Sequence, residues 1–100
     1  MEGDAHVSDI VLRLYIAGKS AISLRAQQNI VSLQRSIKRG CKTEIIDVLV
    51  RPDLAEQAGV LATPTLSFER GGHSRRIVGD LHDTKRVVQF LGIELEEKDA

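Results

Sequence analysis

The sequence predicts a single α/β domain, and three observations carry that prediction. A run rich in β-branched residues near the start, residues 10–18, is typical of a buried strand. It is followed by an apolar stripe at helical spacing and then by a second apolar run. The remaining chain holds two further strand-like runs around a glycine pair. A length of 100 residues suits one domain.

The first half of the chain predicts a strand, a long helix and a second strand. Gly18 is expected to stop the first strand, and Gly40 is expected to end the helix at its carboxyl terminus. The second strand is expected over residues 43–50. A strand–helix–strand unit makes its two strands parallel neighbours. The apolar stripe of the helix is Ala26, Ile30, Leu33 and Ile37, and its polar side carries Arg25, Gln28, Ser32, Arg35 and Arg39.

A short helix is expected next, over residues 51–59. Pro52 suits its first turn, Asp53 lies near its positive end, and Gly59 stops it.

The second half predicts strands over residues 63–70 and 73–79, joined as a hairpin through Gly71-Gly72. A closing helix is expected over residues 82–95, with Asp83 as N-cap and with an apolar stripe of Val87, Val88, Leu91 and Leu95. The segments "RRIVGDL" and "RVVQFLGIEL" are dense in residues that also favour strands, so local preference there does not separate helix from strand.

Composition places the chain among ordinary globular proteins, with 42% hydrophobic and 28% charged residues. No apolar run approaches the roughly 20 residues of a membrane span. The acidic, polar residues 1–9 do not resemble a signal peptide, so a cytoplasmic protein is expected. The expected organisation is a flexible terminus over residues 1–9, a domain over residues 10–95 and an acidic tail over residues 96–100.

The net charge is zero, but the charges are unevenly spread. No acidic residue lies between Asp9 and Glu44, whereas seven basic residues do: Arg13, Lys19, Arg25, Arg35, Lys38, Arg39 and Lys42. This pattern suggests a basic face for an acidic partner; a solvated helix surface explains it equally well.

Several kinds of chemistry are not supported. Cys41 is the only cysteine, so neither a redox pair nor a cysteine-rich zinc site can form, and His6, His73 and His82 lack ligand spacing. The "AGKS" turn resembles a phosphate-binding loop, but Arg13 stands where such a loop needs a glycine. With three aromatic residues, nucleic-acid binding is not indicated either. Catalytic, metal and cofactor sites are therefore not expected, and the aspartates Asp47, Asp80 and Asp83 are interpreted as turn and cap residues.

The segment "GVLATPTLSFERGG", residues 59–72, resembles the third strand of thioredoxins, and the predicted element order is also theirs. In thioredoxins this proline is cis and faces a pair of cysteines. A proline that simply begins an edge strand is the alternative for Thr63-Pro64. The position of the cysteine pair, "AGKSAISLRA", holds no cysteine, and Cys41 is expected far from Pro64. A thiol–disulfide enzyme is therefore a poor fit.

Five collinear segments resemble the KaiB family of bacterial circadian clock proteins. They are "LRLYIAG" (12–18), "SLRA" (23–26), "IDVLVRPDLAE" (46–56), "VLATPTL" (60–66) and "VGDLHD" (78–83). The resemblance implies a non-enzymatic protein that binds the ATPase ring of a KaiC-family hexamer. It also implies two folds: a ground state that assembles into tetramers, or otherwise a smaller oligomer such as a dimer, and a thioredoxin-like monomer that binds KaiC. The second half of the chain differs between the two folds.

By residue, the resemblance assigns Arg25, Pro64, Gly79 and Asp80 to the fold switch or to the KaiC contact. Lys19, Lys42 and Glu44 are further candidate residues for partner binding or the fold switch. Pro64 is then a candidate hinge, and Gly79 could adopt backbone angles that other residues avoid.

The chain also departs from the family pattern. The loop "ERGGHSRR" (69–76) lacks the usual prolines, Lys19 replaces the usual asparagine, and Glu44 stands where lysine is common, two residues after Lys42. KaiA docks near that edge, so a system without KaiA is suggested. The alternatives are a cysteine-poor thioredoxin-fold redox or chaperone-like protein that uses Cys41 alone, and the sensor domain of a SasA-like kinase.

Overall fold

The computed structural model describes residues 10–37, 41–79, 86, 87 and 89, and within them the predicted α/β class is confirmed. The elements are β1 (Ile10–Ile16), α1 (Ala21–Ser36), β2 (Lys42–Asp47), α2 (Pro52–Ala58), β3 (Thr65–Arg70) and β4 (His73–Val78). Among the described residues, no helix has the length and apolar character that crossing a membrane requires.

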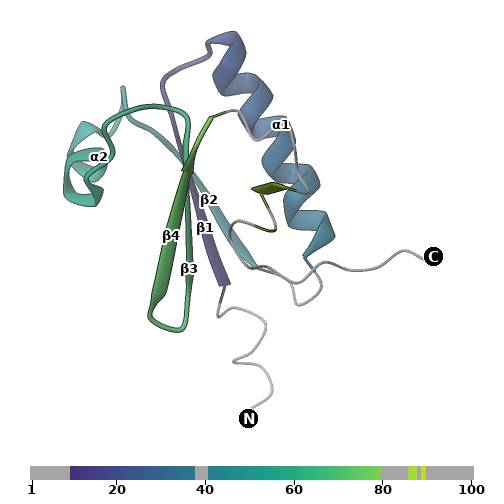
Figure 1. The fold of residues 1–100 in the computed structure, drawn as a ribbon. Helices are drawn as coiled ribbons and strands as arrows, with labels where there is room; N and C mark the ends of the chain where they lie inside the picture. Colours follow the sequence, from purple (N-terminus) through teal and green to yellow (C-terminus); the bar gives the residue numbers. More distant parts are fainter. Residues whose placement is uncertain (1–9, 38–40, 80–85, 88, 90–100) are drawn as a thin grey trace.

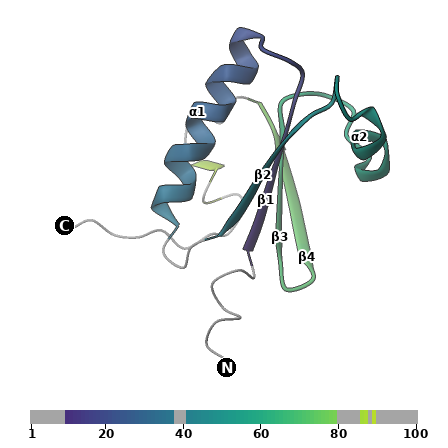
Figure 2. The same ribbon diagram turned by 180° about the vertical axis from the view of Figure 1, so that it is seen from behind.

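The strands form one sheet in the order β2-β1-β3-β4. β1 runs parallel to β2 and antiparallel to β3, and β3 is antiparallel to β4, so the predicted parallel unit and the predicted hairpin are both confirmed. Figures 1 and 2 show α1 on one side of this sheet and α2 on the other.

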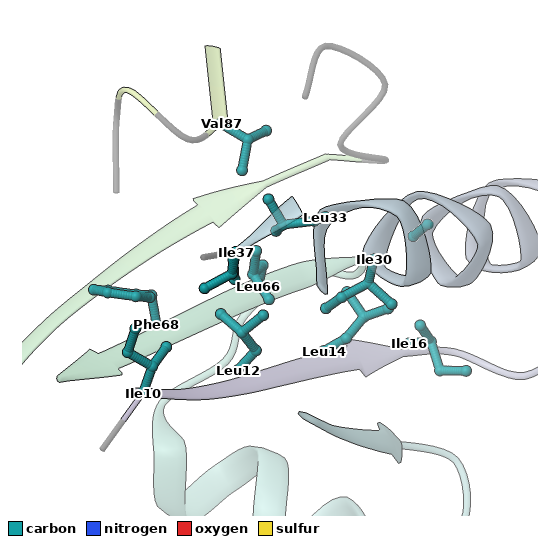
Figure 3. Close-up of a cluster of buried hydrophobic side chains, with 11 residues drawn as sticks. Ile10, Leu12, Leu14, Ile16, Ile30, Leu33, Ile37, Leu66, Phe68 and Val87 are labelled. Carbon is teal, nitrogen blue, oxygen red and sulfur yellow. The ribbon is translucent and has the colours of Figure 1, made fainter. Parts of the chain in front are cut away.

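The hydrophobic core lies between α1 and the sheet (Figure 3). Alternate residues of β1 point to α1, because successive side chains of a strand face opposite sides. Three residues of the predicted stripe, Ala26, Ile30 and Leu33, are confirmed on the buried face of α1, whereas the fourth, Ile37, is buried just after the helix ends. Val87 adds a side chain from the far end of the chain. The core residues are Ile10, Leu12, Leu14, Ile16, Ala26, Ile30, Leu33, Ile37, Leu66, Phe68 and Val87.

The end of α1 differs from the prediction. The helix stops at Ser36 rather than at Gly40, which lies outside the described residues. Ile37 has extended backbone with φ −79° and ψ 120°, and its side chain stays in the core. A β-branched side chain is restricted about χ1 and favours extended backbone over helix. Packing of Ile37 in the core therefore outweighs continuation of the helix.

The second strand is also shorter than predicted. β2 ends at Asp47, and residues 48–50 form a turn in which the backbone N–H groups of Val50 and Arg51 donate to the Asp47 carbonyl at 3.0 and 2.9 Å. Local turn hydrogen bonds therefore replace sheet hydrogen bonds earlier than the apolar run suggested.

The short helix α2 is confirmed with its predicted signals. Pro52 opens it, and Gly59 ends it in the left-handed conformation at φ 71°. Asp53 lies in the first turn, where the Arg51 guanidinium pairs with it at 2.9 Å and lowers the pKa of its carboxyl.

The Thr63-Pro64 bond is cis, and Pro64 is buried just before β3. β3 has a neighbour on each side, so the interpretation of Pro64 as the start of an edge strand is wrong. Of the predicted closing helix, Arg86, Val87 and Gln89 are described as helical, and the rest, with Asp83, lies outside the described residues.

Candidate functional site

Three of the predicted site residues meet at one end of the sheet. We call this the proline end and define it as residues 17–20, 47–51, 61–64 and 78–79. Lys19 lies there with an exposed side chain, together with Pro64 and Gly79. The Gly79 N–H donates to the Pro64 carbonyl at 2.9 Å, which extends the β3–β4 pairing to the proline itself. Gly79 has φ 131°, a backbone conformation that side-chain-bearing residues rarely adopt.

Asp47 joins two of the loops at this end. Its Oδ1 atom accepts from the backbone N–H of Gly18 and from that of Leu49, each at 3.0 Å. The Leu49 side chain in turn lies 3.1 Å from where a Cβ would stand on Gly18. The interpretation of Asp47 as a turn residue is confirmed, but the structure gives it a wider role, because one carboxylate fixes both loops.

The turn between β1 and α1, where the sequence analysis expects the cysteine pair of a thioredoxin, is closed by serine hydrogen bonds. The Ser20 hydroxyl accepts from the backbone N–H of Ser23 at 3.2 Å and caps α1. The Ser23 hydroxyl accepts from the Ser20 hydroxyl at 3.0 Å and from the Ala17 N–H at 3.2 Å, and Ser23 is buried. These hydroxyls are engaged in capping the helix and closing the loop. Sequence reasoning did not identify this role of Ser23, although a Ser-x-x-Ser spacing before an apolar stripe is the signal for it.

The proline end also exposes large apolar side chains that the sequence analysis did not single out. Leu61 is 97% exposed, Leu49 and Val50 are each 70% exposed, and Val78 is 63% exposed. They come from three different segments that the fold brings to the same end. Gathered apolar side chains in water are typical of a surface that meets another protein.

Lys42 and Glu44 lie elsewhere, on the sheet face that α2 partly covers. Glu44 accepts from Arg13 at 2.9 Å, Glu69 pairs with Arg13 at 3.0 Å, and the Lys42 ammonium is 3.9 Å from Glu44. The two carboxylates raise the pKa of the Arg13 guanidinium, Glu69 more than Glu44. Arg13, Glu44 and Glu69 line a shallow hollow of about 390 Å³ beside α2.

The suggested basic face is therefore smaller than the sequence indicated, since Arg13 lies between acidic groups on the opposite side of the sheet from α1. Arg25 and Arg35 are exposed on α1, whereas Lys38, Arg39 and the predicted site residue Asp80 lie outside the described residues.

We expect Arg13→Gln to lower the free energy of unfolding by about 1–2 kcal/mol, because two half-exposed carboxylates lose a shared charged donor. Urea denaturation at low salt measures the change. Lys42→Gln is the matched control, because Lys42 is more exposed and its pairing distance is longer, and it should cost less than about 0.5 kcal/mol. Equal losses of free energy of unfolding in the two variants would mean that the Arg13 ion pairs stabilise the fold no more than the longer Lys42–Glu44 pair does.

Cys41 precedes β2 and lies at the opposite end of the sheet from Pro64, as predicted: its neighbour Lys42 pairs with Val11, whereas Tyr15 pairs with Thr65. Its side chain packs against the core. Burial raises the pKa of the thiol, and a hydrogen bond with Thr43 offsets this only in part, so less of the reactive thiolate forms. Within the described ranges, no three histidine, cysteine or acidic side chains are placed to hold a metal ion.

The fold and the proline end define a protein with the thioredoxin fold, in which the turn between β1 and α1 carries serine hydroxyls and no cysteine. Solved structures with this fold include a thioredoxin from Halobacterium salinarum NRC-1, with a TM-score of 0.72, 23% identity and coverage of 93% of this chain and 82% of that one. Mitochondrial thioredoxin 3 from Saccharomyces cerevisiae gives a TM-score of 0.70 at 19% identity and covers 85% and 78% of the two chains. At these identities the similarity shows the fold alone.

The family follows from sequence similarity. The KaiB domain model matches residues 13–93. The circadian clock oscillator protein KaiB of Parasynechococcus marenigrum (strain WH8102) is 42% identical over 86 residues, which cover 85% of this chain and 81% of that relative. The KaiB of Nostoc punctiforme is 41% identical over 88 residues, covering 87% and 85%. The chain belongs to the KaiB family, as the resemblance predicted, and its relatives are named as clock proteins.

Proposed function

We propose that this protein is a non-enzymatic timing regulator that binds the ATPase ring of a KaiC-family protein through its proline end. The observation that carries the proposal is the set of exposed apolar side chains there: Leu49, Val50 and Leu61 on loops, and Val78 at the end of β4. Asp47 fixes the loop that holds Leu49, and the Gly79–Pro64 hydrogen bond continues the β3–β4 pairing. The names of its KaiB relatives support a role in a clock system.

The thioredoxin-like fold is, in this proposal, the partner-binding state of the chain. The free protein rests as a tetramer or dimer with its second half rearranged and draws on the thioredoxin-like monomer when KaiC is present. The strand-favouring residues of the second half support two packings that differ by only a few kcal/mol. Lys19, Arg25, Gly79 and Asp80 contribute to the contact or to the switch, and the domain spans residues 10–95.

The sheet face that α2 partly covers, which carries Glu44, supports a system without a KaiA-like protein. Glu44 replaces the lysine common in clock KaiB proteins, and here its carboxylate is shared by Arg13 and Lys42. A KaiA-like partner whose surface complements a lysine at this position would instead contact the Glu44 carboxylate, which is already paired with Arg13 and Lys42. The protein then acts in the cytoplasm with KaiC alone, as a simple timer or in a stress response.

Size-exclusion chromatography with a KaiC-family hexamer, after hours of incubation with ATP, tests the proposal. We expect slow co-elution of the wild-type chain. Leu61→Glu should abolish it, because a charge at a fully exposed position disrupts an apolar contact without disturbing the core. Val31→Glu is the matched control, since Val31 is 43% exposed on α1 away from the proline end, and it should co-elute as the wild type does.

The outcomes separate the parts of the proposal. A tetramer-sized peak for the free chain would support a minor binding-competent fold, whereas a monomeric free chain that co-elutes at once would remove the switch and keep the partner. Wild-type protein that never co-elutes would overturn the KaiC assignment. Equal loss in both glutamate variants would place the contact away from the proline end.

A further inference from the structure

The strand β4 forms an edge of the described sheet, and its pairing is uninterrupted. It lies beside β3 in the strand order, and the six residue pairs between them run without a bulge from Thr65–Val78 to Arg70–His73. No described element pairs with its other side. An edge of this kind presents backbone donors and acceptors to which another extended chain can bind.

The backbone groups on the open side can be assigned. The Gly79 N–H bonds to the Pro64 carbonyl, so Gly79 and Pro64 form a hydrogen-bonded pair that continues the β3–β4 register. Such pairs alternate along an antiparallel ladder, which directs the N–H and C=O groups of His73, Arg75 and Ile77 toward β3. The groups of the intervening residues Ser74, Arg76 and Val78 therefore point outward.

The hairpin that carries this edge is basic. Residues 69–76, "ERGGHSRR", hold three arginines against one glutamate, a net charge of +2 with His73 neutral. His73, Arg75 and Arg76 are exposed on β4 itself. Arg76 is held in place because its guanidinium donates to the Gly59 carbonyl at 3.2 Å and to that of Ala58, at the end of α2.

Natural edges are closed by prolines, by bulges or by charge. β4 has neither a proline nor a bulge, so of these three means only positive charge is present on the strand. Like charges directly opposite one another disfavour pairing with a second copy, whereas opposite charges stabilise a cross-strand pair by about 0.2–1 kcal/mol each. The same residues that keep copies of this chain apart thus favour an acidic strand.

We propose that the open edge of β4 binds an extended acidic segment of a partner protein, which adds to the sheet beside β4. The segment bonds to the outward backbone groups of Ser74, Arg76 and Val78, and its carboxylates, on one face of the added strand, lie beside Arg75 and His73, which share a face of β4. This surface runs along β4, meets the proline end only at Val78, and does not depend on KaiC as the partner.

The probe is a synthetic ten-residue peptide that alternates glutamate with valine, and the readout is NMR of the full chain. We expect the amides of Ser74, Arg76 and Val78 to shift and to gain protection from hydrogen exchange. The amides of His73, Arg75 and Ile77, already bonded to β3, should change little. Binding should weaken as salt is raised. A peptide with lysine in place of glutamate should not bind.

The variant Ser74→Pro removes one outward donor and leaves the bonds to β3 in place, because the Ser74 N–H faces away from β3. We expect about tenfold weaker binding of the glutamate peptide, the loss that corresponds to about one backbone hydrogen bond. Ser74→Ala keeps the donor and is the matched control, with less than a twofold change. If Ser74→Pro fails to fold, a peptide N-methylated at alternate residues tests the same bonds on wild-type protein and should not bind.

Three results would overturn the proposal. One is unchanged amides at Ser74, Arg76 and Val78 with the peptide in excess. Another is equal binding of the glutamate and lysine peptides, which would show that charge does not select the strand. The third is concentration-dependent protection of these amides without peptide, which would mean that the edge pairs with a second copy.

Discussion

Asp47→Ala is expected to lower the free energy of unfolding by about 2–4 kcal/mol. The Asp47 carboxylate accepts two backbone hydrogen bonds, from Gly18 and Leu49, and a bond to a charged group contributes about 1.5–3 kcal/mol. The lower part of that range applies to the Leu49 bond, because it is exposed to water. Urea denaturation followed by circular dichroism measures the change.

Asp47→Asn is the matched control for this prediction. Both N–H groups bond to the same oxygen, Oδ1, so an asparagine placed in the same way keeps both bonds and loses only the charge. We expect it to cost about 1 kcal/mol, well below the alanine variant. If the two variants were equally destabilised, charge rather than the two hydrogen bonds would hold the loops together.

The same variants separate stability from partner binding. Under the proposed function, Asp47→Ala frees the loops that carry Lys19, Leu49 and Val50, so binding of the KaiC-family hexamer should weaken even where the chain remains folded. Binding of the hexamer is measured well below the unfolding temperature. Arg13→Gln, which is destabilised on the sheet face away from these loops, is the comparison. If Asp47→Ala binds more weakly than Arg13→Gln, the loss comes from the loops and not from lower stability alone.

Most of the fold was predictable because its signals are local and periodic. The stripe of α1, the glycine that ends α2 and the Gly71-Gly72 hairpin each follow from a few neighbouring residues, and each is confirmed. The boundaries that were wrong depend on contacts that the apolar pattern does not contain. The β2 run extends apolar residues to Val50, but turn hydrogen bonds to the Asp47 carbonyl end the strand there, and the Asp47 carboxylate also bonds to Gly18, 29 residues earlier in the chain.

The candidate site was less predictable from the sequence. Pro64 and Gly79 were identified from the family resemblance, but their hydrogen bond could not be, since it depends on the β3–β4 register. Leu49 and Val50 were assigned to a strand, and only the turn after Asp47 exposes them. The pairing of Arg13 with Glu69 is likewise set by strand order, which charge counts along the chain do not reveal.

Gly79→Ala is expected to destabilise the thioredoxin-like fold by about 1–3 kcal/mol, the usual cost of an unfavourable backbone conformation in a residue with a side chain. Gly79 has φ 131°, and no described atom lies within 4 Å of the Cβ position, so steric overlap is not the cause. If the free chain draws on this fold to bind its partner, apparent affinity falls about tenfold for each 1.4 kcal/mol.

Gly71→Asn is the matched control, because Gly71 also has an open Cβ position but has φ 51°, in the left-handed region that asparagine tolerates. It should cost well under 1 kcal/mol and leave binding unchanged. Chemical denaturation of both variants measures the change in stability, and titration with the partner measures the change in apparent affinity. Should Gly79→Ala bind as tightly as Gly71→Asn, the backbone at residue 79 would not distinguish the binding fold, and the switch would have to depend on residues further along the chain.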